Sequence, residues 1–296
     1  MFVPVDRLAD LDHGRLRVQP SLVDRFADRG WATLEGFTVA SLDQERLMRR
    51  RHDSDGGWDN VRGTIATDDG EQTVFLKRHL LPELARREAD GVAACQRAGV
   101  PVMTVLAVGS TETGRCETPA FYRGPDRRRV ASVLMTAEAG TTDAARLLAD
   151  RADPEAVLPP VARTLGSLHA AGLIHNDCSL VHFRMSGLGD ATARLIDLQN
   201  WRAYPTGSRA HQSRQVKDLA LVRSSLLRIG LGKPVTALWW SLYAAAYEAG
   251  CGHPPPKGLR SLVAVRSDVR RSRAVVRAVR RGRWHRLLPA RLRRAS

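Results

Sequence analysis

A short polar triplet follows a buried apolar stretch near the middle of this 296-residue chain. Residues 165–173 read as a helix that ends at a glycine, and His175-Asn176-Asp177 come next, with His182 after four further residues. This spacing matches H-x-D-x-x-x-x-N, the loop in which phosphoryl-transfer enzymes hold a carboxylate beside the attacking hydroxyl. The pattern predicts that Asp177 is the catalytic base, that His175 is a second catalytic residue of the same loop, and that His182 lies near a metal ion.

A cation, a carboxylate and a metal ligand accompany the triplet in the order that phosphoryl transfer requires. Lys77 ends an apolar strand, where a lysine can contact the α- and β-phosphates of a nucleotide. Glu88, in the helix that follows, is predicted to pair with Lys77, and Glu83 is the competing choice. Asp197 ends the short apolar strand 193–197 and is predicted to bridge Mg²⁺ to the β- and γ-phosphates. ATP and Mg²⁺ are therefore the expected cofactors.

Two further assignments complete the expected nucleotide site. Met135 and Ala137 end an apolar strand just before the expected junction of two lobes and are assigned to ATP binding. Cys178 and His182, at i and i+4, could together bind zinc, but no second pair of ligands accompanies them in the sequence.

The elements that must position these residues change character along the chain. The first part predicts mostly strands, at 31–39, 60–67, 73–79, 100–108, 118–122 and 130–135, with one helix at 81–98. The second part predicts helices at 143–149, 159–171, 218–228 and 235–249. The fold class is therefore α+β: a two-lobed protein-kinase-like fold with a mainly antiparallel sheet in the N-lobe and a helical C-lobe.

The predicted elements and the composition divide the chain into four parts. An N-terminal lead-in covers 1–30, the N-lobe 31–137, the helical C-lobe with the catalytic loop 138–259, and an Arg-rich tail 260–296. The tail holds thirteen arginines and one acid, Asp268, and so supplies about +12 of the net charge of +15. This charge favours an anionic partner, although a solvated basic helix would account for it as well.

Other features narrow the protein class. Hydrophobic residues make up 43% of the chain, which is typical of a folded globular protein. The four cysteines include no C-x-x-C pair, and the N-terminus lacks the pattern of a signal peptide. The apolar run 237–247 is too short to span a bilayer. These features favour a cytoplasmic protein that can lie on a membrane surface.

Departures from the protein-kinase pattern point away from a regulated protein kinase. No Gly-rich G-x-G-x-x-G loop is present. The nearest substitute is 53–59, within the polar stretch 49–60 that is expected to be a mobile loop. Asn176 replaces the arginine that reads a phosphorylated activation loop. About twenty residues separate Asp197 from the next helix, and no A-P-E motif follows. These features favour a constitutively competent kinase for a small molecule or a glycan.

Around these residues the sequence resembles the lipopolysaccharide core kinases, the Kdo/WaaP family that includes the core heptose kinases. The resemblance runs over roughly 74–249. The motifs that carry it are H-x-D-C with a downstream H-F, I-D-L, K-D-L with a following Ser pair, and an N-lobe R-E with a later A-G-V-P. In this sequence the first motif is residues 170–178 with His182-Phe183, and the I-D-L motif is Ile196-Asp197-Leu198. The K-D-L motif is Lys217-Asp218-Leu219, with Ser224-Ser225 after it. The N-lobe motifs are Arg87-Glu88 and residues 98–101.

The resemblance implies a sugar hydroxyl of the lipopolysaccharide inner core, or of a related glycolipid, as the acceptor. It implies that Asp177 is the base, Asp197 the metal ligand, Lys77 the phosphate anchor and Asp218 a structural support for the catalytic loop. It also implies that the enzyme acts on the cytoplasmic side of the inner membrane. Arginines of the tail 260–296 could hold the enzyme there as a peripheral protein.

Three alternatives remain open from the sequence alone. One is a phosphotransferase for a soluble small molecule such as an aminoglycoside. Another is a pseudokinase that binds a glycolipid or a partner protein without turnover. The third is a nucleic-acid-binding protein, but the basic tail offers only Trp284 as an aromatic partner, so no nucleic acid is expected.

Overall fold

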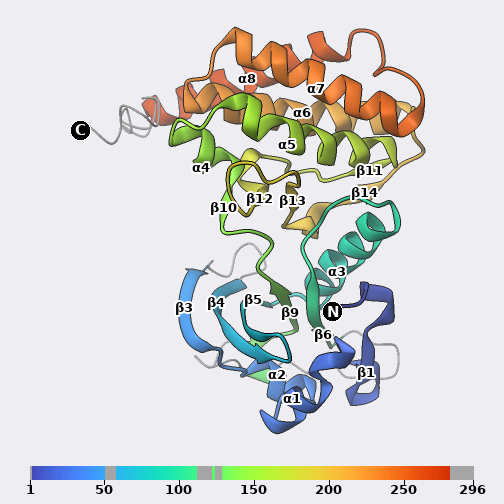
Figure 1. The fold of residues 1–296 in the computed structure, drawn as a ribbon, viewed down its shortest axis with the longest axis vertical. Coiled ribbons are helices and arrows are strands. Elements are labelled where there is room, and N and C mark those ends of the chain that lie inside the picture. The colour runs from blue at the N-terminus through green and yellow to red at the C-terminus, as the bar shows by residue number, and fades with distance from the viewer. Residues whose placement is uncertain (1, 51–57, 112–121, 124–128, 281–296) are drawn as a thin grey trace. The chain divides into compact units, whose positions relative to one another are not determined.

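The computed structural model describes residues 2–50, 58–111, 122–123 and 129–280 (Figure 1). The chain forms two compact units. We call them the N-terminal unit, made of Met1–Gln96 and Met103–Glu138, and the C-terminal unit, made of Arg97–Val102 and Ala139–Ser296.

A seven-stranded antiparallel sheet forms the centre of the N-terminal unit, in the order β1-β2-β6-β9-β5-β4-β3 (Figure 1). The strands expected at 60–67 and 73–79 are confirmed as a hairpin, and the strand expected at 100–108 begins only at Val105. The strand bounds are β1 Ala9–Leu11, β2 Leu16–Val18, β3 Asp43–Arg50, β4 Trp58–Thr67, β5 Gly70–His79, β6 Val105–Ser110 and β9 Ser132–Ala137; the small pair β7 Tyr122–Arg123 and β8 Arg129–Val130 lies outside the sheet.

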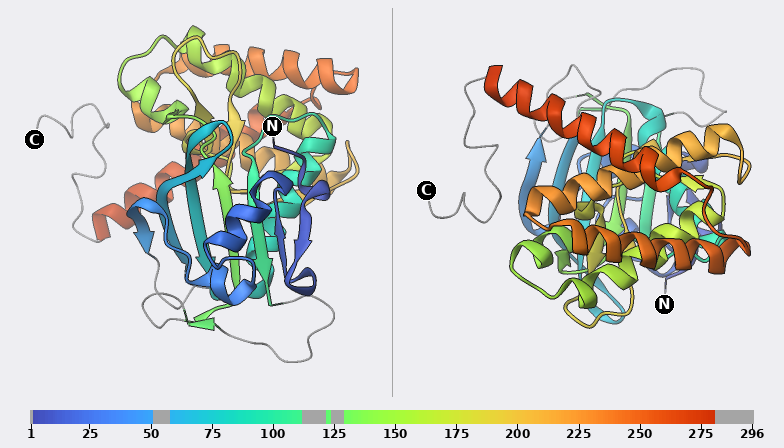
Figure 2. Two further views of the ribbon diagram at one scale, coloured as in Figure 1. Left: turned by 60° about the horizontal axis from the view of Figure 1, so that its bottom comes forward. Right: turned by 90° about the horizontal axis from the view of Figure 1, so that it is seen from above.

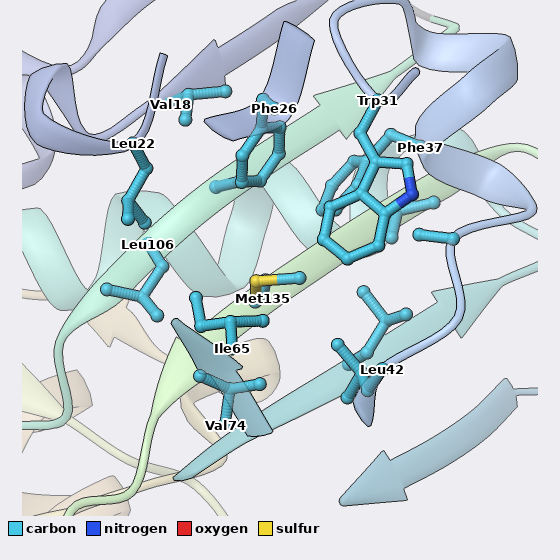
Figure 3. Close-up of a cluster of buried hydrophobic side chains, with 14 of the residues drawn as sticks. Val18, Leu22, Phe26, Trp31, Phe37, Leu42, Ile65, Val74, Leu106 and Met135 are labelled. Atoms are coloured by element: carbon cyan, nitrogen blue, oxygen red, sulfur yellow. The ribbon is translucent and has the colours of Figure 1, made fainter. Parts of the chain in front are cut away.

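Helices lie against both faces of this sheet. α1 (Val23–Asp28) and α2 (Leu34–Thr38) contribute Phe26 and Phe37 to a hydrophobic cluster on one face (Figure 3). Strand alternation places the side chains of Val74 and Leu76 on this same face. The odd-numbered neighbours of β5, Lys77 among them, therefore point to the opposite face, where α3 (Pro82–Arg97) lies. The helix expected at 81–98 is thus confirmed.

The strand predicted at 31–39 is wrong, because most of this segment forms α2. Thr33 caps the helix: its Oγ1 accepts a hydrogen bond from the backbone N–H of Gly36 at 3.1 Å. Leu34, Phe37 and Thr38 are buried, which is the i, i+3, i+4 spacing of a helix with one face in the core. The aromatic and β-branched residues of this segment favour a strand, but the N-cap hydrogen bond and the helical spacing of the buried residues stabilise a helix.

Residues 1–30 are not separate from the sheet. They include three short 3₁₀ turns and α1, as a partly helical lead-in would, but also β1 and β2, and β2 pairs with β6. The polar β3 was not anticipated, and it takes up the start of the stretch 49–60 that was expected to be a loop. The centre of that stretch, 51–57, and most of the strand expected at 118–122 lie outside the described residues.

Helices dominate the C-terminal unit, as predicted (Figure 1). The four helices expected after Gly140 are all present. Those expected at 143–149 and 235–249 match to within two residues at each end, whereas those expected at 159–171 and 218–228 begin earlier, at Pro154 and Arg209. The bounds are α4 Ala144–Ala149, α5 Pro154–Ala170, α6 Arg209–Ile229, α7 Lys233–Cys251 and α8 Leu259–Arg280. The α+β class, with a sheet first and helices after it, is therefore confirmed.

Short strands between the helices hold the loops that carry the chemistry. β10 (Thr142–Asp143), β12 (Phe183–Met185) and β13 (Arg194–Leu195) form a three-stranded sheet. β11 (Leu173–Ile174) pairs with β14 (Arg202–Ala203). The triplet at 175–177 leaves β11, and Asp197 follows β13, so short antiparallel pairings fix the starts of both segments.

The first part of the Arg-rich tail is the helix α8, which crosses α6 (Figure 2). Leu259, Val263 and Ser267 are buried, one turn after another. The Arg223 side chain of α6 donates to Asp268 of α8 at 2.7 Å. α8 is therefore packed into the unit by one face. Within the described residues, no helix combines the length and the apolar character needed to cross a membrane.

Candidate active site

In the N-terminal unit, the predicted pair of Lys77 and Glu88 is formed. Lys77 Nζ lies 2.7 Å from Glu88 Oε1, with the carboxylate fully buried and the lysine side chain 13% exposed. Glu83, the competing choice, is exposed on the same helix. Because a buried carboxylate is stable only when it is paired, this contact fixes the position and the charge of Lys77.

We expect Glu88→Gln to lower both stability and turnover, because it leaves Lys77 charged and without its buried partner. The loss in unfolding free energy should be about 3 kcal/mol, measured by urea denaturation. The double variant Lys77→Met/Glu88→Leu should recover much of that stability but none of the turnover. Glu83→Gln is the matched control and should change neither. Full activity of the double variant would contradict a phosphate-anchoring role for Lys77.

Met135 and Ala137 were assigned to ATP binding from the sequence, and their side chains point away from the face of the sheet that carries Lys77. Met135 pairs with Leu76 and Ala137 with Val74, so both side chains enter the cluster against α1 and α2 (Figure 3). Met135 is fully buried there. The residues of β9 that share the Lys77 face are Ser132, Leu134 and Thr136. Only backbone atoms of Met135 could approach a nucleotide that Lys77 holds.

In the C-terminal unit, the catalytic loop begins where α5 ends at a tight glycine. Gly172 has a φ of 74°, and a Cβ there would collide with the carbonyl oxygen of Tyr204. Asp177 is exposed, as a group that must reach a substrate hydroxyl needs to be. His175 is fully buried instead.

His175 acts as a positioning residue rather than as a catalytic residue that touches substrate. Its Nε2 lies 3.0 Å from the carbonyl oxygen of Ile196 and must donate to it. Its Nδ1 is then free to accept the backbone N–H of Asp177, at 3.3 Å. One neutral ring therefore links the base to the residue before Asp197, which corrects the catalytic assignment of His175.

Asn176 has a structural role that replaces the arginine of protein kinases. Its φ is 67°, a left-handed conformation that asparagine tolerates better than most residues. Its Nδ2 donates to the carbonyl oxygen of Asn200 at 3.0 Å. The catalytic loop is therefore fastened to the segment after Asp197 without a phosphate group, which supports the prediction of a constitutively competent enzyme.

His182 and Asp197, the two residues predicted to bind a metal ion, lie side by side. Nε2 of His182 lies 3.6 Å from Oδ2 of Asp197. Nδ1 of His182 lies 2.7 Å from the carbonyl oxygen of Asp177, so Nδ1 carries the hydrogen and Nε2 keeps its lone pair. Burial lowers the pKa of His182, and the neighbouring His175 lowers it further. A neutral imidazole and a carboxylate can both bind a divalent cation, and the carboxylate is the one of the two that Mg²⁺ prefers.

A zinc site of Cys178 and His182 is not supported. Cys178 is fully buried, and burial raises the pKa of its thiol well above the ordinary value, with Asp218 and Asp177 adding to the shift. The thiolate that zinc requires is therefore disfavoured. The described residues contain no group of three or more His, Cys, Asp or Glu side chains that could hold a metal ion by themselves.

Asp218 is fully buried on α6, and its Oδ2 accepts a hydrogen bond from the backbone N–H of His175 at 2.9 Å. A chain of buried groups leads to it. Gln215 donates to the Tyr243 hydroxyl at 2.6 Å, and that oxygen lies 2.9 Å from Nδ1 of His169. Nε2 of His169 lies 3.4 Å from Oδ2 of Asp218. Each group in this chain can donate a hydrogen bond to the next, from Gln215 through Tyr243 and His169 to Asp218. Asp218, held by His169, orients the catalytic loop through its hydrogen bond with His175.

His169, Gln215 and Tyr243 were not expected from the sequence to support the site. They lie on α5, α6 and α7, respectively, and only the packing of the three helices brings them together. The signal available in the sequence was weak: polar side chains at positions that the helical period assigns to the core.

We expect stability to depend on pH through His211, which packs edge-to-face against His169. Burial lowers the pKa of His211 to about 4, and the neighbouring His169 acts in the same direction. The unfolded chain binds the proton near pH 6.5, so stability is full above pH 6.5 and falls as the pH drops toward 4. The loss should be at most about 3 kcal/mol. Urea denaturation of His211→Leu should show a flatter pH dependence over this range; an unchanged slope would contradict the assignment.

Comparisons with known proteins agree with this geometry. The model of a family described as the lipopolysaccharide kinase (Kdo/WaaP) family matches residues 75–245. The lipopolysaccharide core heptose(I) kinase WaaP of Pseudomonas aeruginosa is 30% identical over 212 residues, which are 67% of this chain and 73% of that protein. A solved structure of WaaP in complex with acyl carrier protein has a TM-score of 0.56 at 23% identity and covers 86% of this chain and 98% of its own. That likeness confirms the kinase-like fold.

Proposed function

Because this chain belongs to the lipopolysaccharide kinase (Kdo/WaaP) family, we propose that it transfers the γ-phosphate of ATP to a sugar hydroxyl of the lipopolysaccharide inner core. A heptose hydroxyl is the acceptor we favour, since the relative from Pseudomonas aeruginosa is a heptose(I) kinase. The observation that carries the proposal is the exposed Asp177 on a loop fixed by buried groups, with His182 and Asp197 paired beside it.

In this proposal each residue has one task. Lys77, held by Glu88, binds the α- and β-phosphates. Asp197 and His182 would hold Mg²⁺, which neutralises charge on the phosphates when it is bound. Asp177 accepts a hydrogen bond from the acceptor hydroxyl and directs its lone pair at the γ-phosphorus. The protein thus contributes positioning and charge rather than a covalent intermediate.

The direct test uses purified protein, ATP and inner-core lipopolysaccharide that carries unphosphorylated heptose. Mass spectrometry should show a gain of one phosphate on a heptose. A soluble aminoglycoside as the better acceptor would favour the small-molecule alternative. Equal and negligible rates of ATP turnover for the wild type and for Asp197→Asn would favour a pseudokinase.

We also propose that the enzyme works as a peripheral protein on the cytoplasmic face of the inner membrane. The support is the charge of the tail 260–296 and the lipid-linked acceptor. The tail should not be deleted as a whole, because Leu259, Val263 and Ser267 pack α8 into the fold. Removal of 281–296 alone keeps α8. Unchanged binding to anionic vesicles after this truncation would show that those residues are not needed.

A further inference from the structure

Three exposed aliphatic side chains follow one side of α8, and we call them the exposed stripe. Leu262 is 59% exposed, Val265 62% and Val269 46%, and they occupy the i, i+3 and i+7 positions of one helix. The side chains that pack α8 into the fold are a separate set: Leu259, Val263 and Ser267. α8 therefore carries aliphatic residues on two sides, and the fold buries one of them.

The exposed stripe is the densest group of its kind in the described part of the chain. Seven large hydrophobic side chains are exposed there, and three of them belong to the stripe. The other four lie on separate segments: Val39, Leu81, Val181 and Leu188. Single exposed aliphatic residues are ordinary on a protein surface. A row of three on one helix indicates a surface that another molecule covers.

Basic side chains border the exposed stripe. Arg266 and Arg270 each follow a stripe residue directly and are exposed, and neither forms a hydrogen bond or an ion pair within the described residues. Asp268, the single acid of α8, is already bound to α6. A groove of about 460 Å³ beside the stripe adds Arg209 and Lys257, with no acidic side chain in its lining. The partner of this surface must therefore be anionic as well as apolar.

The charge of α8 decides between the two partners that its apolar spacing suits, a second helix and a lipid surface. α8 carries seven arginines and one acid along its 22 residues. A second copy of α8 would bring a like charge against these arginines and repel them. An anionic bilayer attracts all of them together, and a helix with an apolar row beside basic residues is typical of helices that lie in the headgroup region.

We propose that Leu262, Val265 and Val269 enter the headgroup region of an anionic lipid bilayer, with Arg266 and Arg270 against the lipid phosphates. α8 lies along the membrane surface in this arrangement and does not cross it. The inference rests on the proposed function, in which the acceptor is linked to lipid. It assigns the membrane attachment to one side of α8.

Sedimentation of the full chain with vesicles tests this surface without turnover. The vesicles hold equal parts of phosphatidylglycerol and phosphatidylcholine, and pure phosphatidylcholine vesicles are the zwitterionic comparison. Leu262→Ser and Val269→Ser should each weaken binding to the anionic vesicles about tenfold, because each removes aliphatic carbons from the lipid. Arg266→Gln and Arg270→Gln should each weaken it about fivefold, and added salt should lower the affinity of the wild type.

Leu188→Ser is the matched control, because Leu188 is 60% exposed in the same unit but lies between β12 and β13, away from α8. It should bind the vesicles like the wild type, and thermal unfolding should be the same for all of these surface variants. Equal binding of the wild type to the two kinds of vesicle, or wild-type affinity in both serine variants of α8, would overturn the proposal. So would a dimer in solution that Leu262→Ser dissociates, because the stripe would then join two copies of the chain.

Kinetics with two acceptors separate this inference from the proposed function. On deacylated inner-core oligosaccharide, which is soluble, the serine variants of α8 should keep the kcat and KM of the wild type. On lipopolysaccharide held in anionic vesicles, they should raise the KM for the acceptor about tenfold. Wild-type KM values on both acceptors would refute the membrane surface and leave the kinase intact. Absence of turnover on any acceptor, together with vesicle binding that depends on the stripe, would refute the function and support the surface.

Discussion

Asp177→Asn should lower kcat by a factor of about 10²–10⁴, the usual contribution of a positioned general base. The amide keeps the shape of the side chain but cannot accept the hydroxyl proton. The backbone should stay in place, because Asp177 N–H is held by His175 and its carbonyl by His182. The side chain is exposed, so the unfolding free energy should change by less than about 0.5 kcal/mol.

The measurement is steady-state phosphate transfer from labelled ATP, with thermal unfolding as the check on the fold. Glu248→Gln is the matched control, since Glu248 is an exposed carboxylate on α7 in the same unit. It should keep wild-type kcat. An Asp177→Asn enzyme within fivefold of wild type would mean that another group orients the hydroxyl and that the catalytic loop was assigned wrongly.

The catalytic loop was predictable because its residues are close in the sequence. The helix end, the glycine and H-x-D are consecutive, so linear spacing alone fixes their relation. Lys77 and Glu88 were predictable for a related reason, since a strand followed directly by a helix brings the two side chains to one face of the sheet. In each case only local geometry had to be assumed.

Residues that depend on packing were not predictable in this way. His169 and Tyr243 lie on α5 and α7, and their relation to Asp218 exists only once three helices have packed. The face on which the Met135 side chain lies was not predictable for a different reason. The strand was recognised, but the face of each residue depends on its register with Leu76, and pattern alone did not supply that register.

The second large effect is expected at Asp197. Its φ is 64°, a left-handed conformation in which most residues with a side chain are strained. Asparagine is among the residues that tolerate it, so Asp197→Asn changes the charge and leaves the backbone undisturbed, whereas Asp197→Ala would combine both effects. The variant keeps an oxygen near Nε2 of His182 but loses the negative charge that holds a divalent cation.

We therefore expect Asp197→Asn to need more Mg²⁺ for half-maximal turnover and to lose a factor of about 10²–10⁴ in kcat at saturating Mg²⁺, because the metal supplies several kcal/mol of charge stabilisation. A Mg²⁺ titration at fixed ATP measures both quantities.

His182→Asn is the informative comparison: it restores the ligand of the protein-kinase loop and should retain most of the Mg²⁺ activity, since a carboxamide oxygen suits Mg²⁺ at least as well as an imidazole does. Wild-type Mg²⁺ dependence in Asp197→Asn would place the metal elsewhere. Equal losses in the two variants would mean instead that the imidazole is an obligatory ligand, and that this site differs from the protein-kinase site in its metal chemistry as well as in its sequence.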